Sequence, residues 1–236
     1  MTIDPSTLVE KLRGRFLVFD GPDGAGKSTQ RALLADALIA GDGGVESCRD
    51  PGGTIIGDRI RSVLLDHDLS GMDVNCETLL FMASRAQLVR EVVKPALEAH
   101  RIVLCDRFVT STCAYQGAAG YDPKSVIELA RFAIDDCWPD LTLIIDVAPE
   151  DGFSRTGRSS GDVGKNRKQA SGQPLLFEGA QTDAMEARPI DFHRRVRDIF
   201  LGVHEYYPRP VVLVDGNGDQ DTVHRRILEE LSRVAW

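Results

Sequence analysis

Nine consecutive residues near the start of the chain have the types and spacing of a phosphate-binding loop. They fit the pattern G-x-x-x-x-G-K-[ST] and read Gly21, Pro22, Asp23, Gly24, Ala25, Gly26, Lys27, Ser28 and Thr29. Glycines let the backbone curl so that successive N–H groups face a phosphate, and a helix starting near Lys27 adds the positive end of its dipole. Lys27 would reach the β- and γ-phosphates, and Ser28 would hold a magnesium ion. The loop therefore predicts binding of a nucleoside triphosphate with Mg²⁺.

A second motif narrows the class of phosphate-loop protein, which could be a kinase, a GTPase switch or a motor or remodelling ATPase. The guanine-reading motif Asn-Lys-x-Asp of GTPases is absent, and Asp50-Pro51-Gly52-Gly53 fits only the loose pattern D-x-x-G. An ATPase would end an apolar strand in paired acids, whereas Cys105-Asp106-Arg107 places a cation beside the acid. A guanidinium grips a phosphate through two hydrogen bonds, so the motif favours a kinase with an anionic acceptor.

Apolar clusters with the length of strands must position these motifs. They lie at residues 16–19, 45–48, 102–105, 141–145 and 211–214, and segments with helical spacing separate them. Near-continuous apolar strands that alternate with helices indicate a parallel sheet covered on both faces. We therefore expect a three-layer α/β fold with a five-stranded parallel sheet, formed by a single domain over residues 1–236.

Charged residues follow every one of these clusters. They are Asp20, Arg49-Asp50, Asp106-Arg107, Asp146 and Asp215, in chain order. Ligands of open α/β sheets bind beyond the carboxyl ends of the strands, so a site is expected where these residues gather. For Asp146 and Asp215, a polar loop that follows a strand explains the pattern equally well.

Composition excludes several classes of protein. The net charge of −8, from 28 Lys and Arg against 36 Asp and Glu, argues against binding to nucleic acid polymers or anionic membranes. No apolar run approaches the roughly 20 residues that span a bilayer, and the N-terminus lacks the apolar core of a signal peptide. Five cysteines without a C-x-x-C pair indicate reduced thiols. We therefore expect a cytoplasmic protein.

Four segments together resemble the thymidylate kinase family. They are FDGPDGAGKSTQ at 19–30, RDPGGT at 49–54, LLFMASRAQLV at 79–89 and DRFVTSTCAYQG at 106–117. The resemblance runs from about residue 16 to the C-terminal helix. It implies transfer of the γ-phosphoryl group of ATP to dTMP, with ATP and Mg²⁺ bound and a homodimer formed through helices.

The resemblance also assigns roles to individual residues. It implies that Phe81 stacks on the thymine ring and that Arg85, four residues further on a helix, hydrogen-bonds its edge. Arg107 and Arg49 would hold the acceptor phosphate, and Asp23 would contact the deoxyribose. Base and sugar contacts would come from Ser111, Thr112, Tyr115 and Gln116. Asp106 would act with Ser28 at the magnesium ion, and the loop at Pro51 is compatible with a cis peptide bond.

A glycine-rich, basic segment after the fourth strand resembles the lid of the family. Residues 152–173 carry five positive charges and one negative charge, which indicates a mobile loop, and lid plus insertion extend over about 152–182. In one subtype of the family an arginine follows the loop aspartate; here that residue is Gly24, so the lid should supply the catalytic cation. Arg155 and Arg158 are the candidates.

The lid is also where the chain departs from the family. An insertion covers about residues 161–180, and Ala184 stands at a position where an arginine is usual. Arg188 or Arg167 could substitute for it. Two alternative functions remain open at this point: a kinase for another nucleoside monophosphate or a nucleoside, and a nucleotide-binding switch without transferase activity.

Overall fold

The computed structural model describes residues 4–66, 71–157, 185, 187–234 and 236, and its centre is a five-stranded sheet. All neighbouring strands are parallel and their order is β2-β3-β1-β4-β5. The strands are β1 (Phe16–Asp20), β2 (Val45–Arg49), β3 (Ile102–Asp106), β4 (Leu141–Asp146) and β5 (Val211–Asp215). The predicted sheet is confirmed. Each strand runs one residue further than its apolar cluster, because the charged residue that follows still belongs to the strand.

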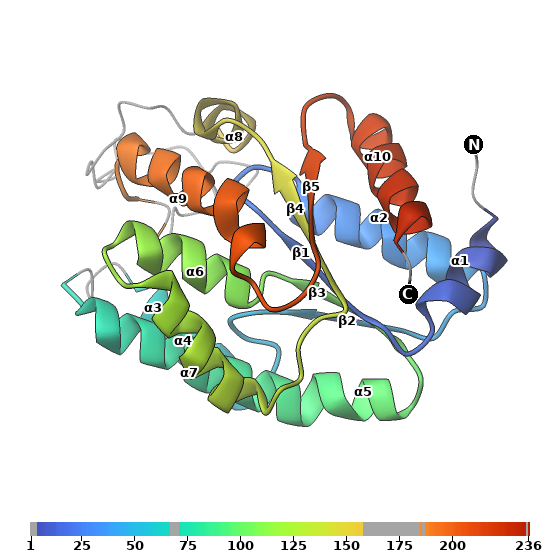
Figure 1. The fold of residues 1–236 in the computed structure, drawn as a ribbon, viewed down its shortest axis with the longest axis horizontal. Helices are drawn as coiled ribbons and strands as arrows, with labels where there is room; N and C mark the ends of the chain where they lie inside the picture. Colours follow the sequence, from blue (N-terminus) through green and yellow to red (C-terminus); the bar gives the residue numbers. More distant parts are fainter. Residues whose placement is uncertain (1–3, 67–70, 158–184, 186, 235) are drawn as a thin grey trace, which may run out of the picture.

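Helices cover both faces of this sheet (Figure 1). The described helices, in chain order, are α1 (Pro5–Leu12), α2 (Lys27–Ala40), α3 (Ile55–Leu64), α4 (Val74–Leu88), the π-helix η2 (Val89–Val93), α5 (Lys94–Glu98), α6 (Val109–Ala118), α7 (Pro123–Ile134), α8 (Pro149–Arg155), α9 (Ile190–Gly202), the 3₁₀ helix η3 (Val203–Glu205) and α10 (Gln220–Arg233). None of them is long and apolar enough to cross a membrane, as far as the described residues extend.

The two faces of the sheet bury separate cores. Along β1, Phe16 and Val18 pack with α4, α6, α7 and α9, whereas Leu17 and Phe19 pack with α1, α2 and α10. This alternation follows from the two-residue period of a strand. Because the core fills both faces, the loops at the carboxyl edge of the sheet are the place where a polar site can form.

The loop after β1 packs against α8 at two glycines, Gly24 and Gly152, where there is no space for a side chain on either residue. A Cβ atom on Gly24 would lie 2.2 Å from the carbonyl oxygen of Gly152, and a Cβ atom on Gly152 would lie 2.2 Å from that of Asp23. Gly24 also has a φ of +74°, which favours glycine. The phosphate loop and the start of the predicted lid are therefore in direct backbone contact.

The first residues of the predicted lid are helical. Residues 152–155 are the last turn of α8, which starts with Pro149 and carries Glu150 and Asp151 in its first turn, where both residue types favour a helix. Arg158, Arg167, the insertion at about 161–180 and Ala184 lie outside the described residues. The single-domain assignment stays a prediction.

Candidate active site

The phosphate loop connects β1 to α2, as its sequence predicts. Gly26 caps α2 in the left-handed conformation, so the helix starts at Lys27. The buried ammonium group of Lys27 donates to the carbonyl oxygen of Pro22 at 2.7 Å. Burial and the positive charge of Arg107 lower the pKa of Lys27 to about 8, although nearby carboxylates oppose the shift. A triphosphate beside this amine would favour its charged form, so Lys27 is suited to hold phosphate.

A pocket of about 380 Å³ opens beside the loop. Its lining comes from the phosphate loop, from the ends of β2 and β3 and from α3, and consists of Asp23, Gly24, Gly26, Lys27, Ser28, Thr29, Arg49, Asp50, Arg61, Asp106 and Arg107. Most of the predicted phosphate-binding residues therefore face one cavity. Gly21 and Ala25 belong to the same loop without lining the pocket; Gly21 packs so tightly on β4 that a Cβ atom would lie 2.3 Å from the Ile145 carbonyl oxygen.

Ser28 and Asp106 meet at the edge of this pocket. The hydroxyl group of Ser28 donates to a carboxylate oxygen of Asp106, which ends β3. No group of three or more His, Cys, Asp or Glu side chains with the arrangement of a metal site occurs in the described part of the chain. Two oxygen ligands fit Mg²⁺ nevertheless, because this ion usually takes one or two protein oxygens together with water and substrate phosphates.

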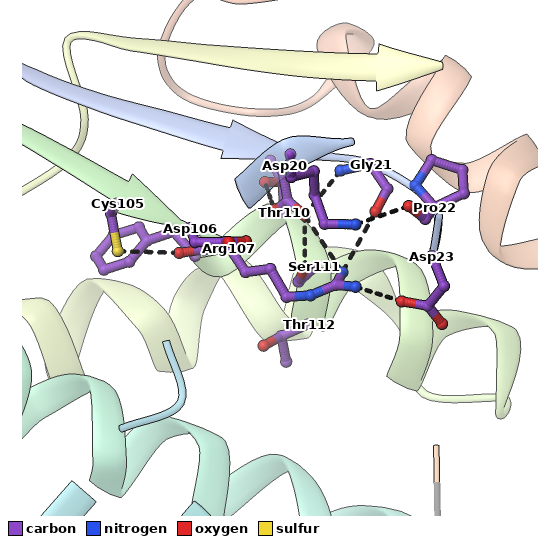
Figure 2. Close-up of polar contacts among 12 residues, drawn as sticks. Asp20, Gly21, Pro22, Asp23, Cys105, Asp106, Arg107, Thr110, Ser111 and Thr112 are labelled. Carbon is purple, nitrogen blue, oxygen red and sulfur yellow. Dashed lines mark hydrogen bonds and ion pairs between the residues drawn. The ribbon is translucent and has the colours of Figure 1, made fainter. Parts of the chain in front are cut away.

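Arg107 is the centre of the polar network at the end of β3 (Figure 2). Its guanidinium group pairs with Asp23 and donates to Ser111 Oγ at 3.2 Å and to the carbonyl oxygen of Gly21 at 3.3 Å. It also lies 5.3 Å from the ring centre of Tyr115. Arg107 thus joins the phosphate loop to α6 and presents a partly buried positive charge to the pocket.

Asp23 is the acidic partner in this network. Burial alone would raise the pKa of Asp23, but the charges of Arg107 and Lys27 outweigh it and hold the pKa at about 2. The Nδ1 atom of His193, on α9, lies 3.8 Å from the second carboxylate oxygen. Asp23 is therefore ionised at neutral pH and balances the cations around it.

Arg85 lies deeper than its predicted contact with a base edge indicates. Its side chain is 1% exposed, and Nε donates to Asp50 Oδ2 at 2.5 Å. Nη2 donates to Thr112 Oγ1 at 2.9 Å and to the Phe108 carbonyl oxygen at 3.2 Å. Burial raises the pKa of Asp50, although Arg85 opposes the shift. Arg85 therefore joins the loop after β2 to α6, and the peptide bond between Asp50 and Pro51 is cis, as the sequence allowed.

The other predicted acceptor residues divide into two groups. Arg49 lines the pocket and pairs with Asp58 at 3.3 Å, whereas Phe81 is half-buried on α4. Thr112, Tyr115 and Gln116 are buried along α6, outside the pocket lining. The structure therefore brings together the two arginines predicted to hold the acceptor phosphate, and it keeps the predicted base contacts within the packing of α4 against α6.

Of the two first candidates for the lid cation, Arg155 lies within the described residues; the alternative, Arg188, is also described and pairs with Glu77. Arg155 is exposed, and its guanidinium group donates to the carbonyl oxygen of Gly216, after β5, at 3.1 Å. It does not line the described pocket. Its catalytic role stays a prediction, and the described geometry gives it a different partner from the phosphates.

Several residues of the site were not found by sequence reasoning. Arg61 of α3 lines the pocket and donates to the Pro51 carbonyl oxygen at 3.0 Å, and His193 faces Asp23. Asp50 was expected near the site, but not as the partner of Arg85. Glu77 pairs with Arg188 at 2.7 Å. Asp50 follows a strand within a quoted motif and could have been identified as the partner of an arginine. The other residues carry no local signal, because their neighbours in space are distant in sequence.

Known proteins similar to this chain agree with the geometry. The family model for thymidylate kinase matches residues 19–227. The thymidylate kinase of Protochlamydia amoebophila (strain UWE25) is 38% identical over 229 residues, 96% of this chain and 95% of the relative. That of Prosthecochloris aestuarii (strain DSM 271 / SK 413) is 39% identical over 219 residues, 92% of each chain.

A solved structure supports the same assignment. The crystal structure of thymidylate kinase from Ehrlichia chaffeensis superposes with a TM-score of 0.67 and 32% sequence identity, and the match covers 92% of this chain and 98% of the other. Both the sequence match and the fold therefore extend over nearly the whole length. Together with a phosphate loop that shares its pocket with acceptor-side arginines, they show that the chain belongs to the thymidylate kinase family.

Proposed function

We propose that the protein transfers the γ-phosphoryl group of ATP to dTMP and releases dTDP and ADP. The observation that carries this proposal is the position of Arg107, which faces the phosphate loop across one pocket and pairs with Asp23. A triphosphate on Lys27 leaves room on the Arg107 side for a second anionic group. Family membership supports dTMP as the molecule that brings this group.

The chemical step needs alignment and charge neutralisation more than acid–base catalysis. A phosphate oxygen of dTMP attacks the γ-phosphorus, and the bond from that phosphorus to the β–γ bridging oxygen breaks, so that its electrons leave with ADP. The attacking oxygen is already ionised and needs no strong base. Lys27 holds the donor phosphates, and Arg107 with Arg49 orients the acceptor phosphate. These cations reduce the repulsion between the two anionic substrates.

We propose Ser28 and Asp106 as the residues that hold Mg²⁺. The ion would neutralise charge on the phosphate oxygens of ATP. The hydroxyl group of Ser28 already contacts the carboxylate of Asp106, so the two oxygens converge on one side of the pocket. Asp23 stays outside this pair, because its carboxylate is engaged by Arg107.

The acceptor base is assigned to α4 and α6. We propose that Phe81 stacks on thymine and that Arg85, Thr112 and Gln116 lie around its edge. Ser111 and Tyr115 would contact the sugar and phosphate together with Asp23. The packing of α4 on α6 supports this proposal, since Arg85 and Thr112 are already hydrogen-bonded across it. Arg155 and Arg158 are proposed as the lid cations that close over the phosphates.

An assay of ADP release with ATP, Mg²⁺ and a panel of acceptors tests this function. We expect fastest turnover with dTMP and slower turnover with dUMP, UMP and CMP. Equal turnover with these acceptors would favour the alternative of a broader nucleoside monophosphate kinase. ATP binding without turnover of any acceptor would favour a nucleotide-binding switch.

We further propose a single-domain homodimer located in the cytoplasm. Large apolar side chains are exposed on α3, α4 and α7, and they are Ile55, Ile56, Val63, Leu79 and Phe132. Phe132 is 91% exposed, and α4 packs against both α3 and α7, so these helices form one side of the molecule (Figure 1). Light scattering of the purified protein should give twice the monomer mass, and Phe132→Asp should lower it. The five cysteines are free thiols, which fits a reducing compartment.

A further inference from the structure

Two pairs of side chains connect α4 to α6 on either side of Phe81. Glu77, Phe81 and Arg85 are spaced four residues apart on α4, so they lie on one face of that helix. Glu77 accepts a hydrogen bond from Gln116, and Arg85 donates to Thr112, which is four residues before Gln116 on α6. The half-buried ring of Phe81 therefore lies between one polar pair on each side.

The contact with Glu77 fixes which end of the Gln116 amide faces it. The distance from Gln116 Nε2 to Glu77 Oε2 is 3.1 Å. Glu77 also accepts from Arg188 at 2.7 Å, and it is a carboxylate that has no proton to donate. Only the NH₂ end of the amide can face such a group. The carbonyl end of Gln116 therefore points away from Glu77.

That carbonyl oxygen is a buried acceptor in need of a donor. Gln116 is fully buried, and its Oε1 atom has no hydrogen-bond partner among the described residues. A buried polar atom without a partner costs free energy, which a ligand with a suitable donor would recover. On the other side of Phe81, four of the five N–H donors of Arg85 are engaged by Asp50, Met82, Phe108 and Thr112.

We propose that Glu77, supported by Arg188, is a positioning residue that selects thymine and uracil bases over cytosine through the orientation of Gln116. This inference rests on the proposed function. Thymine and uracil present a donor at N3–H beside the acceptor O4, whereas cytosine presents the acceptor N3 beside a donor amino group. A Gln116 carbonyl turned away from Glu77 and toward the base would match N3–H and repel the lone pair of the cytosine N3.

Arg188 connects the Glu77–Gln116 pair to the part of the chain that follows the predicted lid. Its guanidinium group pairs with Glu77 and lies 4.6 Å from the ring centre of Phe192 on α9. Arg188 donates to Oε1 of Glu77, and Gln116 donates to Oε2, so both carboxylate oxygens of Glu77 accept hydrogen bonds. Substitution of Arg188 should weaken the preference for dTMP although no residue of α4 or α6 is changed.

The test compares dTMP with dCMP in wild type and in Glu77→Gln. The new amide can donate to Gln116 Oε1, which lets Gln116 turn its NH₂ group toward the base. We expect the ratio of kcat/KM for dTMP to that for dCMP to fall by about tenfold, the size of one hydrogen bond, while KM for ATP stays unchanged. Glu98→Gln, an exposed change on α5, is the matched control and should leave the ratio unchanged.

Glu77→Asp separates this role from simple packing. Aspartate keeps an acceptor-only group, so it should retain more selectivity than the isosteric Glu77→Gln variant. If Glu77 only fills space, the order should be reversed, because glutamine preserves the volume, and that result would overturn the proposal. If the Glu77 variants do not fold, Arg188→Met can be used to measure the same ratio of dTMP to dCMP turnover, because the side chain of Arg188 is partly exposed.

The outcomes also separate this inference from the proposed function. Wild-type protein without dTMP turnover would contradict the dTMP kinase activity itself. A wild type that prefers dTMP, together with an unchanged dTMP to dCMP ratio in Glu77→Gln and Arg188→Met, would contradict only the role of Glu77. A fall in this ratio in both variants, with KM for ATP unchanged, supports the proposal.

Discussion

The phosphate-donor half of the site is formed by one continuous loop, whereas the acceptor half is assembled from side chains on separate elements. Backbone N–H groups and the helix start at Lys27 form the donor half, and its glycines are required for close approach. Arg107, Arg85 and Glu77 form the acceptor half and are held by partners far away in sequence. We therefore expect changes in the donor half to abolish turnover, and changes in the acceptor half to alter which substrate is used and how tightly it binds.

The largest expected effect is in the donor half. Lys27→Met removes the cation that faces the triphosphate, and kcat should fall by about a thousandfold, as for the loss of a transition-state contact. Binding of dTMP, measured by calorimetry without ATP, should change little. Lys124→Met, which changes an exposed side chain on α7, is the control and should keep full activity. A Lys27→Met enzyme with near-normal kcat would remove the distinction between the halves.

The close contact between the phosphate loop and α8 should make the free energy of unfolding sensitive to substitution of Gly152. Alanine normally stabilises a helix relative to glycine, but a Cβ on Gly152 would lie 2.2 Å from the Asp23 carbonyl oxygen. Gly152→Ala should therefore lower the free energy of unfolding by about 3 kcal/mol. Gly202→Ala, near the end of α9 with nothing within 4 Å of its added Cβ, should be neutral or stabilising. Urea unfolding of both variants measures the difference, and equal stabilities would show that the loop and α8 can separate easily.

In the acceptor half, Arg107→Ala should separate the two substrates. Loss of the charged contact should raise KM for dTMP by about a hundredfold and change KM for ATP far less. Steady-state kinetics with each substrate varied in turn gives both values. The exposed Arg209→Ala serves as the control. An equal rise in both KM values would show that Arg107 maintains the phosphate loop as a whole.

The smallest expected effect is on stability at low pH, and it concerns Asp23, whose negative charge lies between Lys27 of the donor half and Arg107 of the acceptor half. Its pKa of about 2 in the folded protein lies below the ordinary value of 3.8, so the ionised form stabilises the fold. This contribution is complete above about pH 4 and is lost as the pH falls toward 2, and it amounts to about 2 kcal/mol. Asp23→Asn should be less stable than wild type by this amount at pH 7, and the difference should vanish near pH 2. A difference that is constant over this range would contradict the ionised state.

Local sequence predicted the donor half well, because its function depends on a contiguous backbone. The five strands and the helix at Lys27 were confirmed, and so was the thymidylate kinase family. The charged residues at the ends of β2 and β3 do gather at one pocket, whereas Asp20 of β1 is buried and accepts hydrogen bonds from Thr110 and Ser111. Asp146 of β4 pairs with Arg197 at 2.7 Å, and Asp215 of β5 contacts Asn217 and Arg226. For these last two, the plainer explanation of a polar strand end applies.

The acceptor half was predicted only in part, because it depends on long-range pairing. The helical spacing of Phe81 and Arg85 placed both on one face, but it did not indicate that Asp50, 35 positions away from Arg85, would hold the guanidinium group. The pairing of Glu77 with Arg188 spans 111 positions and the whole lid. The first residues of the predicted lid, 152–155, are helical, and their composition did not indicate this because the helix-favouring Pro149-Glu150-Asp151 comes before them.

The touching glycines of the phosphate loop and α8 also limit how this enzyme could be redesigned. Any side chain at position 24, including the arginine that some members of the family carry there, would place its Cβ atom 2.2 Å from the carbonyl oxygen of Gly152, which is a steric clash. An arginine at position 24, in place of the cation that we propose for the lid, would therefore require α8 to shift as well as residue 24 to be replaced. Gly24 and Gly152 are therefore sterically coupled. A side chain at either position requires the backbone around the other position to move.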